Sequence, residues 1–229
     1  MRTIGLIGGM SWESTEVYYR TANELVRDRL GGLNSAKILL ASMNFQEISE
    51  LQTAGRWEDA GNQLAETARG LERAGANMIL ICTNTMHLLV DQVQAAVSIP
   101  VLHIGDVAAR AVRAKHLDRV ALLGTAFTME KAFYRERIAG HGIDVLVPGE
   151  ADRAEIHRAI FEELAVGIVS EETRARFRDI IARVVAEGAQ GVILGCTEIE
   201  LLVGAEDSPV PVFPTARLHI EAAVELALS

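Results

Sequence analysis

Two short segments hold the only two cysteines of the chain, and in each segment an apolar run ends in a Cys-Thr pair. Residues 75–84 read GANMILICTN, and residues 188–198 read GAQGVILGCTE. Each apolar run predicts a buried strand, and each cysteine stands where that strand ends. A thiol that recurs once in each of two similar segments indicates a site that needs one thiol on each side.

Cys82 and Cys196 are suited to act as paired acid and base. In open α/β sheets, ligands bind beyond the carboxyl ends of the strands, which is where both thiols are expected. The amides and dipole of a helix that follows should lower the thiol pKa and favour the thiolate. A thiolate on one face of a carbon and a thiol on the other can remove one proton and return another. Such a pair inverts the carbon with neither a metal nor a pyridoxal cofactor.

Inversion beside a carboxylate also builds negative charge on the substrate, and donors must stabilise that charge. Hydroxyls and amides next to the two cysteines are candidates, as are backbone N–H groups that follow the first strand of each half. These candidates are Thr83, Asn84, Thr85, Thr197 and its neighbour Glu198, Thr125, and the Gly9–Ser11 backbone with Met10 and Ser11.

Three other roles are available to the cysteines: a place in the core, a disulfide and a zinc ligand. A single buried cysteine is most often a small core residue, but two in matched segments favour function. In the cytoplasm both thiols should stay reduced. His87 and Glu198 lie near the cysteines, yet no Cys-x-x-Cys or paired-His spacing predicts a zinc site. We expect no metal, and we expect the isolated His103 and His219 to be structural.

Short apolar runs alternate with longer amphipathic stretches along the whole chain, which is typical of β-α units around a mainly parallel sheet. The expected strands are 3–7, 37–42, 78–82, 99–102, 119–123, 143–147, 191–195 and 210–213. The first expected helix begins after Ser11, which is its N-cap. The other expected helices span 57–75, 86–97, 129–140, 154–167, 170–188 and the C-terminal stretch. Trp12, Tyr18 and Tyr19 are expected to pack the first of these helices.

The second half of the chain repeats the first. Residues 4–8 match 120–124, and residues 18–20 match 133–135, in the same order as the two cysteine segments. We therefore predict an α/β protein of two similar domains, each a mainly parallel sheet flanked by helices, with the active site in the cleft between them. The domains are expected at 1–103 and 104–213, with a C-terminal helix at about 214–229 packing back on the first.

Charge and hydropathy exclude several classes of protein. The net charge of −9 argues against a nucleic-acid partner and against attraction to anionic membranes. No apolar stretch approaches the roughly 18 residues of a membrane span, and the N-terminus lacks the pattern of a signal peptide. The segment GLIGG at 5–9 lacks the spacing of a dinucleotide loop and is expected to let a small anion approach the backbone. A cytoplasmic protein with a small-molecule partner is expected.

Several motifs in chain order resemble the aspartate/glutamate racemase family, cofactor-independent enzymes of two similar α/β domains. They are GGMSWEST at 8–15, CTNTMH at 82–87, FEEL at 161–164 and GCTEI at 195–199. The resemblance implies that Cys82 and Cys196 are the acid–base pair of an amino-acid racemase. It also implies that Met10, Gln52, Thr83 to Thr85 and Thr197 contact an amino-acid substrate. By analogy with the family, we expect a homodimer.

One departure from the family pattern concerns the substrate. Family members that act on acidic amino acids tend to carry a lysine just after Glu-Glu-Leu, whereas this chain has Ala165. A carboxylate buried without a cation is costly, which favours neutral or hydroxylated amino acids and resembles the broad-specificity racemases. Arg56 could supply the missing charge, so an aspartate or glutamate racemase stays an alternative.

Other functions on the same scaffold also stay open. They are a decarboxylase, a cis-trans isomerase such as a maleate isomerase, and a non-catalytic protein that binds small acids. The presence of both cysteines favours the racemase over these three. A thiol-disulfide oxidoreductase is disfavoured, because the chain has no Cys-x-x-Cys.

Overall fold

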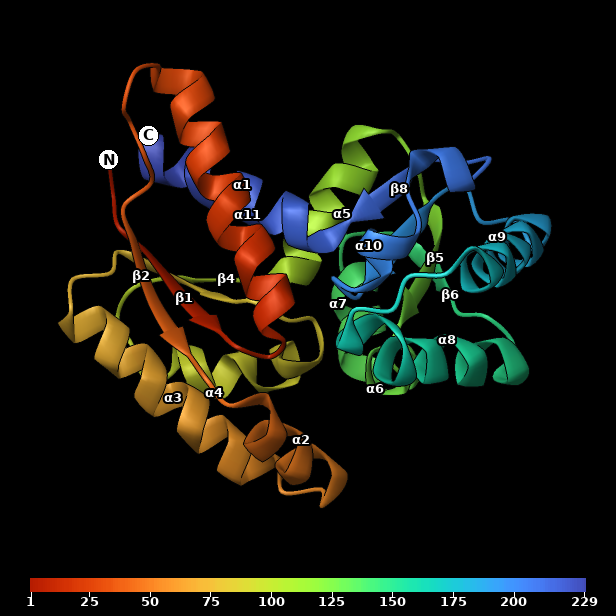
Figure 1. The fold of residues 1–229 in the computed structure, drawn as a ribbon, viewed down its shortest axis with the longest axis horizontal. Coiled ribbons are helices and arrows are strands. Elements are labelled where there is room, and N and C mark those ends of the chain that lie inside the picture. The colour runs from red at the N-terminus through yellow and green to blue at the C-terminus, as the bar shows by residue number, and fades with distance from the viewer. The chain divides into compact units, whose positions relative to one another are not determined.

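A computed structural model describes all residues from 1 to 229, and the chain divides into two compact units. Unit 1 comprises Met1–Ile104 and His219–Ser229, and unit 2 comprises Gly105–Leu218. Each unit holds one four-stranded, all-parallel sheet with flanking helices (Figure 1), as the α/β pattern of the sequence predicts. No helix is both long enough and apolar enough to cross a membrane.

The sheet of unit 1 has the strand order β2-β1-β3-β4. Its elements in chain order are β1 (Ile4–Gly8), α1 (Trp12–Leu30), β2 (Ile38–Ser42), α2 (Phe45–Thr53), α3 (Trp57–Arg73), β3 (Met78–Ile81), the 3₁₀ helix η1 (Thr85–Leu89), α4 (Val90–Gln94) and β4 (Val101–Leu102).

The sheet of unit 2 has the equivalent order β6-β5-β7-β8. The remaining elements are α5 (Ile104–Ala114), β5 (Arg119–Gly124), α6 (Ala126–Glu130), α7 (Ala132–Ala139), β6 (Asp144–Leu146), α8 (Glu150–Glu162), η2 (Leu164–Val166), α9 (Glu171–Ala186), β7 (Val192–Gly195), α10 (Ile199–Leu202), η3 (Ala205–Asp207), β8 (Val212–Pro214) and α11 (Thr215–Leu228). The chain passes from unit 1 to unit 2 at the start of α5 and returns within α11.

Helix α1 begins where the sequence predicts. The Ser11 side chain accepts a hydrogen bond from the Ser14 amide at 3.2 Å, which satisfies one N–H of the first turn. Tyr18 is fully buried and packs the helix as expected. The same expectation is wrong for Trp12 and Tyr19, which are 67% and 53% exposed, because the residues of α1 that pack inward are spaced as Tyr18, Ala22 and Val26.

The core of unit 1 lies between its sheet and α3. Ile7, Ile79 and Ile81 point to one face of the sheet, where they join a buried cluster with α3 residues such as Leu64. Figure 1 shows α3 along this face and α1 along the opposite one. Both faces of the sheet are therefore covered, which is the usual condition of a parallel sheet.

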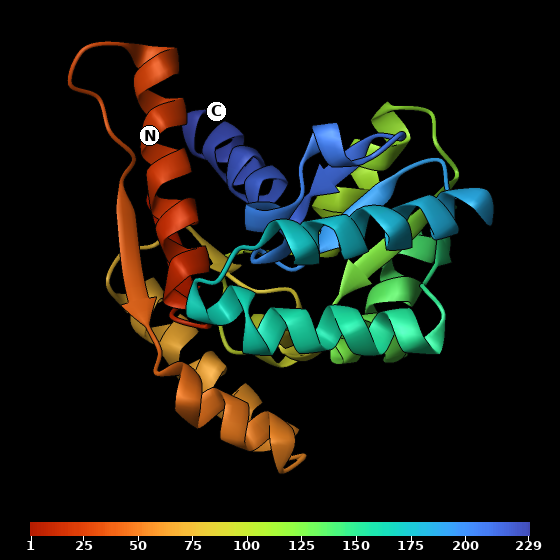
Figure 2. The ribbon, with the colours of Figure 1, turned by 45° about the vertical axis from the view of Figure 1, so that its right-hand side comes forward.

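Unit 2 is built in the same way. Ala121, Leu123 and Leu194 belong to one buried cluster with residues of α8 and α9, among them Phe177. Figure 2 shows α8 and α9 running side by side over the strands of this unit. The apolar side of α9 thus faces this core.

Four helical regions differ from the sequence-based expectation. Helices α2 and α5 were not predicted, and α5 occupies the stretch where a domain boundary was expected. The helix expected at 86–97 begins as the 3₁₀ helix η1 and is followed by the short α4. The helix expected at 129–140 is interrupted at Lys131, whose extended backbone (φ −72°, ψ 144°) separates α6 from α7.

The glycines after β1 allow a close backbone approach. Gly9 has φ +81°, and a Cβ there would lie 2.1 Å from the Met43 carbonyl oxygen. The Met43 amide in turn donates to the Gly8 carbonyl at 3.0 Å. The segment that approaches this glycine pair is therefore the chain leaving β2.

Candidate active site

In unit 1, the two loops that carry predicted site residues are neighbours. Strands β1 and β3 pair in parallel, with Ile7 opposite Ile81, so both loops leave from the same edge of the sheet. The Cys82 amide donates to the Ile7 carbonyl at 2.9 Å and continues the ladder by one residue. Met10 and Ser11 follow β1 and are therefore brought to the same edge as the Cys82 loop, and the side chains of Met10, Ser11 and Cys82 are buried.

Gln52 reaches the same loop from a different element. It lies on α2, and its Nε2 donates to the Met86 sulfur at 2.9 Å. Met86 belongs to η1 and follows Thr83, Asn84 and Thr85 in the chain. Asn84 and Thr85 are 3% and 7% exposed, and Thr83 is half-buried. A thioether is a weak acceptor, so this amide gains little from the contact.

In unit 2, Thr125 and the Cys196 segment form the corresponding group. They follow the paired strands β5 and β7, in which Gly124 stands opposite Gly195. Thr125 is the N-cap of α6, and its Oγ1 accepts from the Thr128 amide at 3.3 Å. The predicted residues therefore fall into one group per unit, each at the carboxyl edge of its own sheet.

Glu198 has a defined place beside the second thiol. Its Oε2 accepts hydrogen bonds from the Cys196 Sγ and from the Thr197 Oγ1, both at 2.9 Å. All three side chains are buried, with exposures of 7–8%. That Glu198 contacts the substrate stays a prediction; within unit 2 its carboxylate accepts the hydrogen bond of the thiol and lies where it can take the thiol proton.

The expectation that helix N-termini lower the pKa of the thiols is wrong. Burial raises the pKa of the Cys82 thiol. The pKa of Cys196 is raised by burial and then by the Glu198 charge, and the amides of Glu198 and Ile199 oppose this only in part. The helices that follow are η1 and α10, of five and four residues, and such short helices offer a weak dipole against full desolvation.

Two polar groups support these loops in a way that the sequence did not predict: His87, which was considered only as a zinc ligand, and the half-buried Glu200. His87, 1% exposed, contacts the Thr83 carbonyl and lies against the rings of His103 and His219, with centroids 4.8 and 5.6 Å away. Glu200 accepts from the Ala216 amide at 3.0 Å, at the start of α11, and burial raises its pKa to about 8. Their only signal in the sequence is a polar residue inside an apolar stretch. No group of three or more His, Cys, Asp or Glu is arranged to hold a metal ion.

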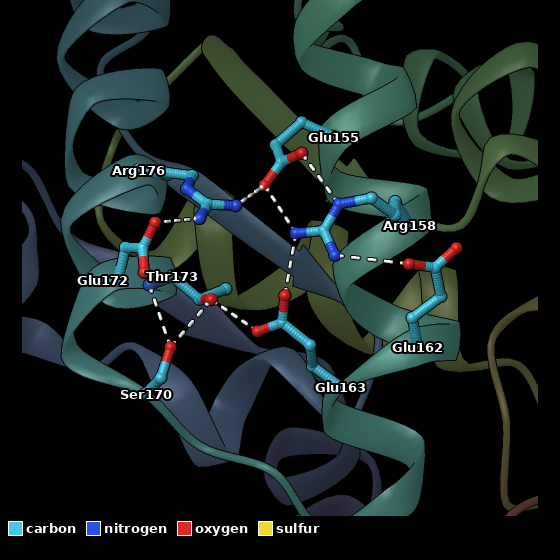
Figure 3. A network of polar contacts seen from close by, with 8 residues as sticks. All are labelled: Glu155, Arg158, Glu162, Glu163, Ser170, Glu172, Thr173 and Arg176. Atoms are coloured by element: carbon cyan, nitrogen blue, oxygen red, sulfur yellow. Dashed lines mark hydrogen bonds and ion pairs between the residues drawn. The ribbon is translucent and has the colours of Figure 1, made fainter.

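Ala165, the position from which a substrate preference was expected, lies in η2 and is half-buried. Figure 3 shows a polar network that includes Glu163, two positions before Ala165 in the chain; in it, Arg158 binds three carboxylates, those of Glu155, Glu162 and Glu163. Glu163 also accepts a hydrogen bond from Thr173 on α9. The cation nearest to Ala165 along α8 is therefore already neutralised by acidic side chains.

Comparison with known proteins gives consistent matches. A family model described as Asp/Glu/Hydantoin racemase matches residues 7–223. A candidate Asp/Glu racemase from Yersinia pestis is 49% identical, with 100% of both chains covered and a TM-score of 0.94. An aspartate racemase homologue from Pyrococcus horikoshii OT3 is 37% identical with the same coverage and a TM-score of 0.88. The broad specificity amino-acid racemase RacX of Bacillus subtilis (strain 168) is 21% identical over 167 residues, which is 69% of this chain and 68% of that protein.

The contact between Glu198 and Cys196 predicts a direction for a pKa change. The Glu198 charge, and the hydrogen bond that its carboxylate accepts, both favour the protonated thiol, so Glu198→Gln should lower the pKa of Cys196. In a Cys82→Ala background, the rate of alkylation at Cys196 should reach half its maximum at a lower pH when Glu198 is replaced by Gln.

A matched control is Glu206→Gln, which removes the same charge from an exposed position of unit 2. Its alkylation curve should coincide with that of the Cys82→Ala parent. A Glu198→Gln curve that coincides with the control, or that moves to higher pH, contradicts the electrostatic role of Glu198.

Proposed function

The chain belongs to the Asp/Glu/Hydantoin racemase family, and on that premise we propose that it is an amino-acid racemase in which Cys82 and Cys196 are the two acid–base groups. Racemases are isomerases, and this places the protein in that enzyme class. The proposed reaction inverts the α-carbon of a free amino acid and uses no cofactor.

One observation carries the proposal: the two thiols occupy equivalent positions in two equivalent sheets. Cys82 follows β3 in the order β2-β1-β3-β4, and Cys196 follows β7 in the order β6-β5-β7-β8. A reaction that removes a proton from one face of a carbon and delivers one to the other needs two similar groups, one for each face. The chain has two cysteines, and both stand at such a position.

The proposed mechanism assigns different local support to each thiol. When Cys196 has to act as the base, Glu198 accepts the proton of its thiol, because the Glu198 carboxylate already accepts a hydrogen bond from that S–H group. At Cys82, burial alone raises the pKa, which favours the protonated form that a general acid requires. The roles exchange when the opposite enantiomer is the substrate.

The remaining site residues are proposed to bind the substrate and to stabilise charge. Hydroxyls and amides of Thr83, Asn84 and Thr85 in unit 1 and of Thr125 and Thr197 in unit 2 are suited to the carboxylate, which becomes more negative as the proton leaves. Met10, Ser11 and Gln52 would border the amino acid from unit 1. Gln52 has the capacity to do so, because its amide is held only by the Met86 sulfur.

For the substrate class, we propose neutral or hydroxylated amino acids, accepted with broad specificity. Ala165 offers no charge for a side-chain carboxylate, and the Arg158 guanidinium is held by three acids. RacX, which is described as broad in specificity, is among the relatives.

A second candidate is an aspartate or glutamate racemase, and Arg56 is the observation that favours it. Arg56 directly precedes α3, its side chain is 59% exposed, and its ion pair with Asp59 is long, at 3.8 Å. A weakly paired arginine retains the capacity to bind another carboxylate. The P. horikoshii relative is described as an aspartate racemase homologue.

The two-thiol assignment is tested by replacing each cysteine. A panel of L-amino acids is first screened for D-product, and the best substrate is then given to Cys82→Ala and Cys196→Ala. Each variant should lose racemisation by at least about 10³-fold, as expected for the loss of an essential acid–base group. Melting temperatures close to that of the wild type would exclude unfolding as the cause. If Cys82→Ala kept the wild-type rate, the assignment would be wrong.

A wild-type protein that binds amino acids and racemises none of them supports the non-catalytic alternative.

The specificity assignment is tested at Ala165. Ala165→Lys should raise kcat/KM for L-aspartate relative to L-serine by about tenfold or more, because it supplies a cation for the side-chain carboxylate. The matched control is Val166→Lys, which adds the same charge at the next position, where the side chain is 64% exposed. Equal effects at both positions would mean that the charge acts at long range, and an unchanged ratio at Ala165 would remove this residue from the substrate site.

A further inference from the structure

His87 makes three hydrogen bonds that close the loop after Cys82. Its backbone amide donates to the Asn84 carbonyl at 3.1 Å. Its ring Nδ1 lies 2.8 Å from the Thr83 carbonyl, and its ring Nε2 lies 3.2 Å from the Ile104 amide. The imidazole is therefore bound on both sides while being almost fully buried.

The partners of His87 fix its tautomer. A carbonyl only accepts, so Nδ1 carries the proton toward Thr83, and an amide only donates, so Nε2 offers its lone pair to Ile104. This arrangement requires a neutral ring. Burial and the neighbouring His103 and His219 hold the pKa of His87 well below its ordinary value, which agrees with that requirement.

The chain of contacts continues to the helix that returns from unit 2. The Nε2 of His219 on α11 donates to the Leu102 carbonyl at 3.0 Å, and its Nδ1 lies 2.9 Å from the Tyr18 hydroxyl. Leu102 and Ile104 flank His103, so both imidazoles bind the same short segment between β4 and α5. The orientation of His87 is thus supported by a segment that is itself held from α1 and α11.

The hydrogen bond from the His87 ring to the Thr83 carbonyl also determines which way the backbone N–H of Asn84 points. The Thr83–Asn84 peptide is trans, since the cis bond of this chain lies between Met10 and Ser11. In a planar trans peptide the C=O and the N–H point in opposite directions. With the Thr83 carbonyl held toward the buried ring, the Asn84 N–H points away from that ring.

We propose that His87 is a positioning residue for the racemase site: it fixes the Thr83–Asn84 peptide so that the Asn84 N–H is presented to the substrate carboxylate. This inference rests on the proposed function, in which the 83–85 segment binds that carboxylate. His87 does not touch the substrate and acts through the peptide that it holds.

Two substitutions separate this role from a general structural one. His87→Asn keeps a donor near the Nδ1 position and loses the acceptor for Ile104, whereas His87→Gln keeps an acceptor near the Nε2 position and loses the donor to Thr83. Each variant removes one buried hydrogen bond, so both should lower the melting temperature by similar amounts. Only His87→Gln should raise KM, by about tenfold or more, because only that variant releases the peptide; His87→Asn should stay within about threefold of the wild type.

The outcomes distinguish this proposal from the function it rests on. Equal kinetic losses in the two folded variants, or a wild-type KM in His87→Gln, would overturn the positioning role. If the wild-type protein racemises no amino acid, the proposed function fails, and ¹⁵N NMR of histidine-labelled protein still tests the geometry. A proton on Nδ1 of His87 is expected there, and a proton on Nε2 would overturn the assignment.

Discussion

Burial of the two thiols is the constraint on which the rest of the site depends. Each cysteine follows an inner strand of its sheet, β3 or β7, and Cys82 and Cys196 are 0% and 8% exposed. Such burial protects a thiol from solvent but disfavours its charged form, so the pKa of both cysteines is raised. A site that needs a thiolate must then provide a local acceptor for the proton and donors for the charge that forms.

The polar residue that supports the cysteine loop differs between the two units, although their sheets are equivalent. In unit 2, the Glu198 carboxylate receives hydrogen bonds from both Cys196 and Thr197. In unit 1, the polar residue that supports the loop is His87, whose neutral ring holds a backbone carbonyl rather than the thiol. The two copies of the fold therefore carry different polar residues at the same strand end.

Much of this arrangement could be predicted from the sequence, because it follows from local patterns. The β-α alternation gave the α/β class, the repeated Cys-Thr segments identified equivalent strand ends, and Ser11 marked the start of α1. What could not be predicted depends on tertiary contacts. The pKa direction of the thiols is set by desolvation, which outweighs a short helix dipole. The clustering of His87, His103 and His219 joins residues far apart in the chain, and the exposure of Trp12 depends on which face of α1 meets the sheet.

The central claim, that two thiols act from opposite faces of one carbon, is tested most directly by the fate of the α-proton. The L-amino acid that is racemised fastest is incubated with the enzyme in deuterium oxide, and both enantiomers are recovered at low conversion. A two-base reaction predicts deuterium at the α-carbon of the D-product and protium in the remaining L-substrate, with the reverse labelling when the D-enantiomer is supplied. Deuterium that accumulates in recovered substrate as fast as in product would contradict the account, because a single base would then serve both faces.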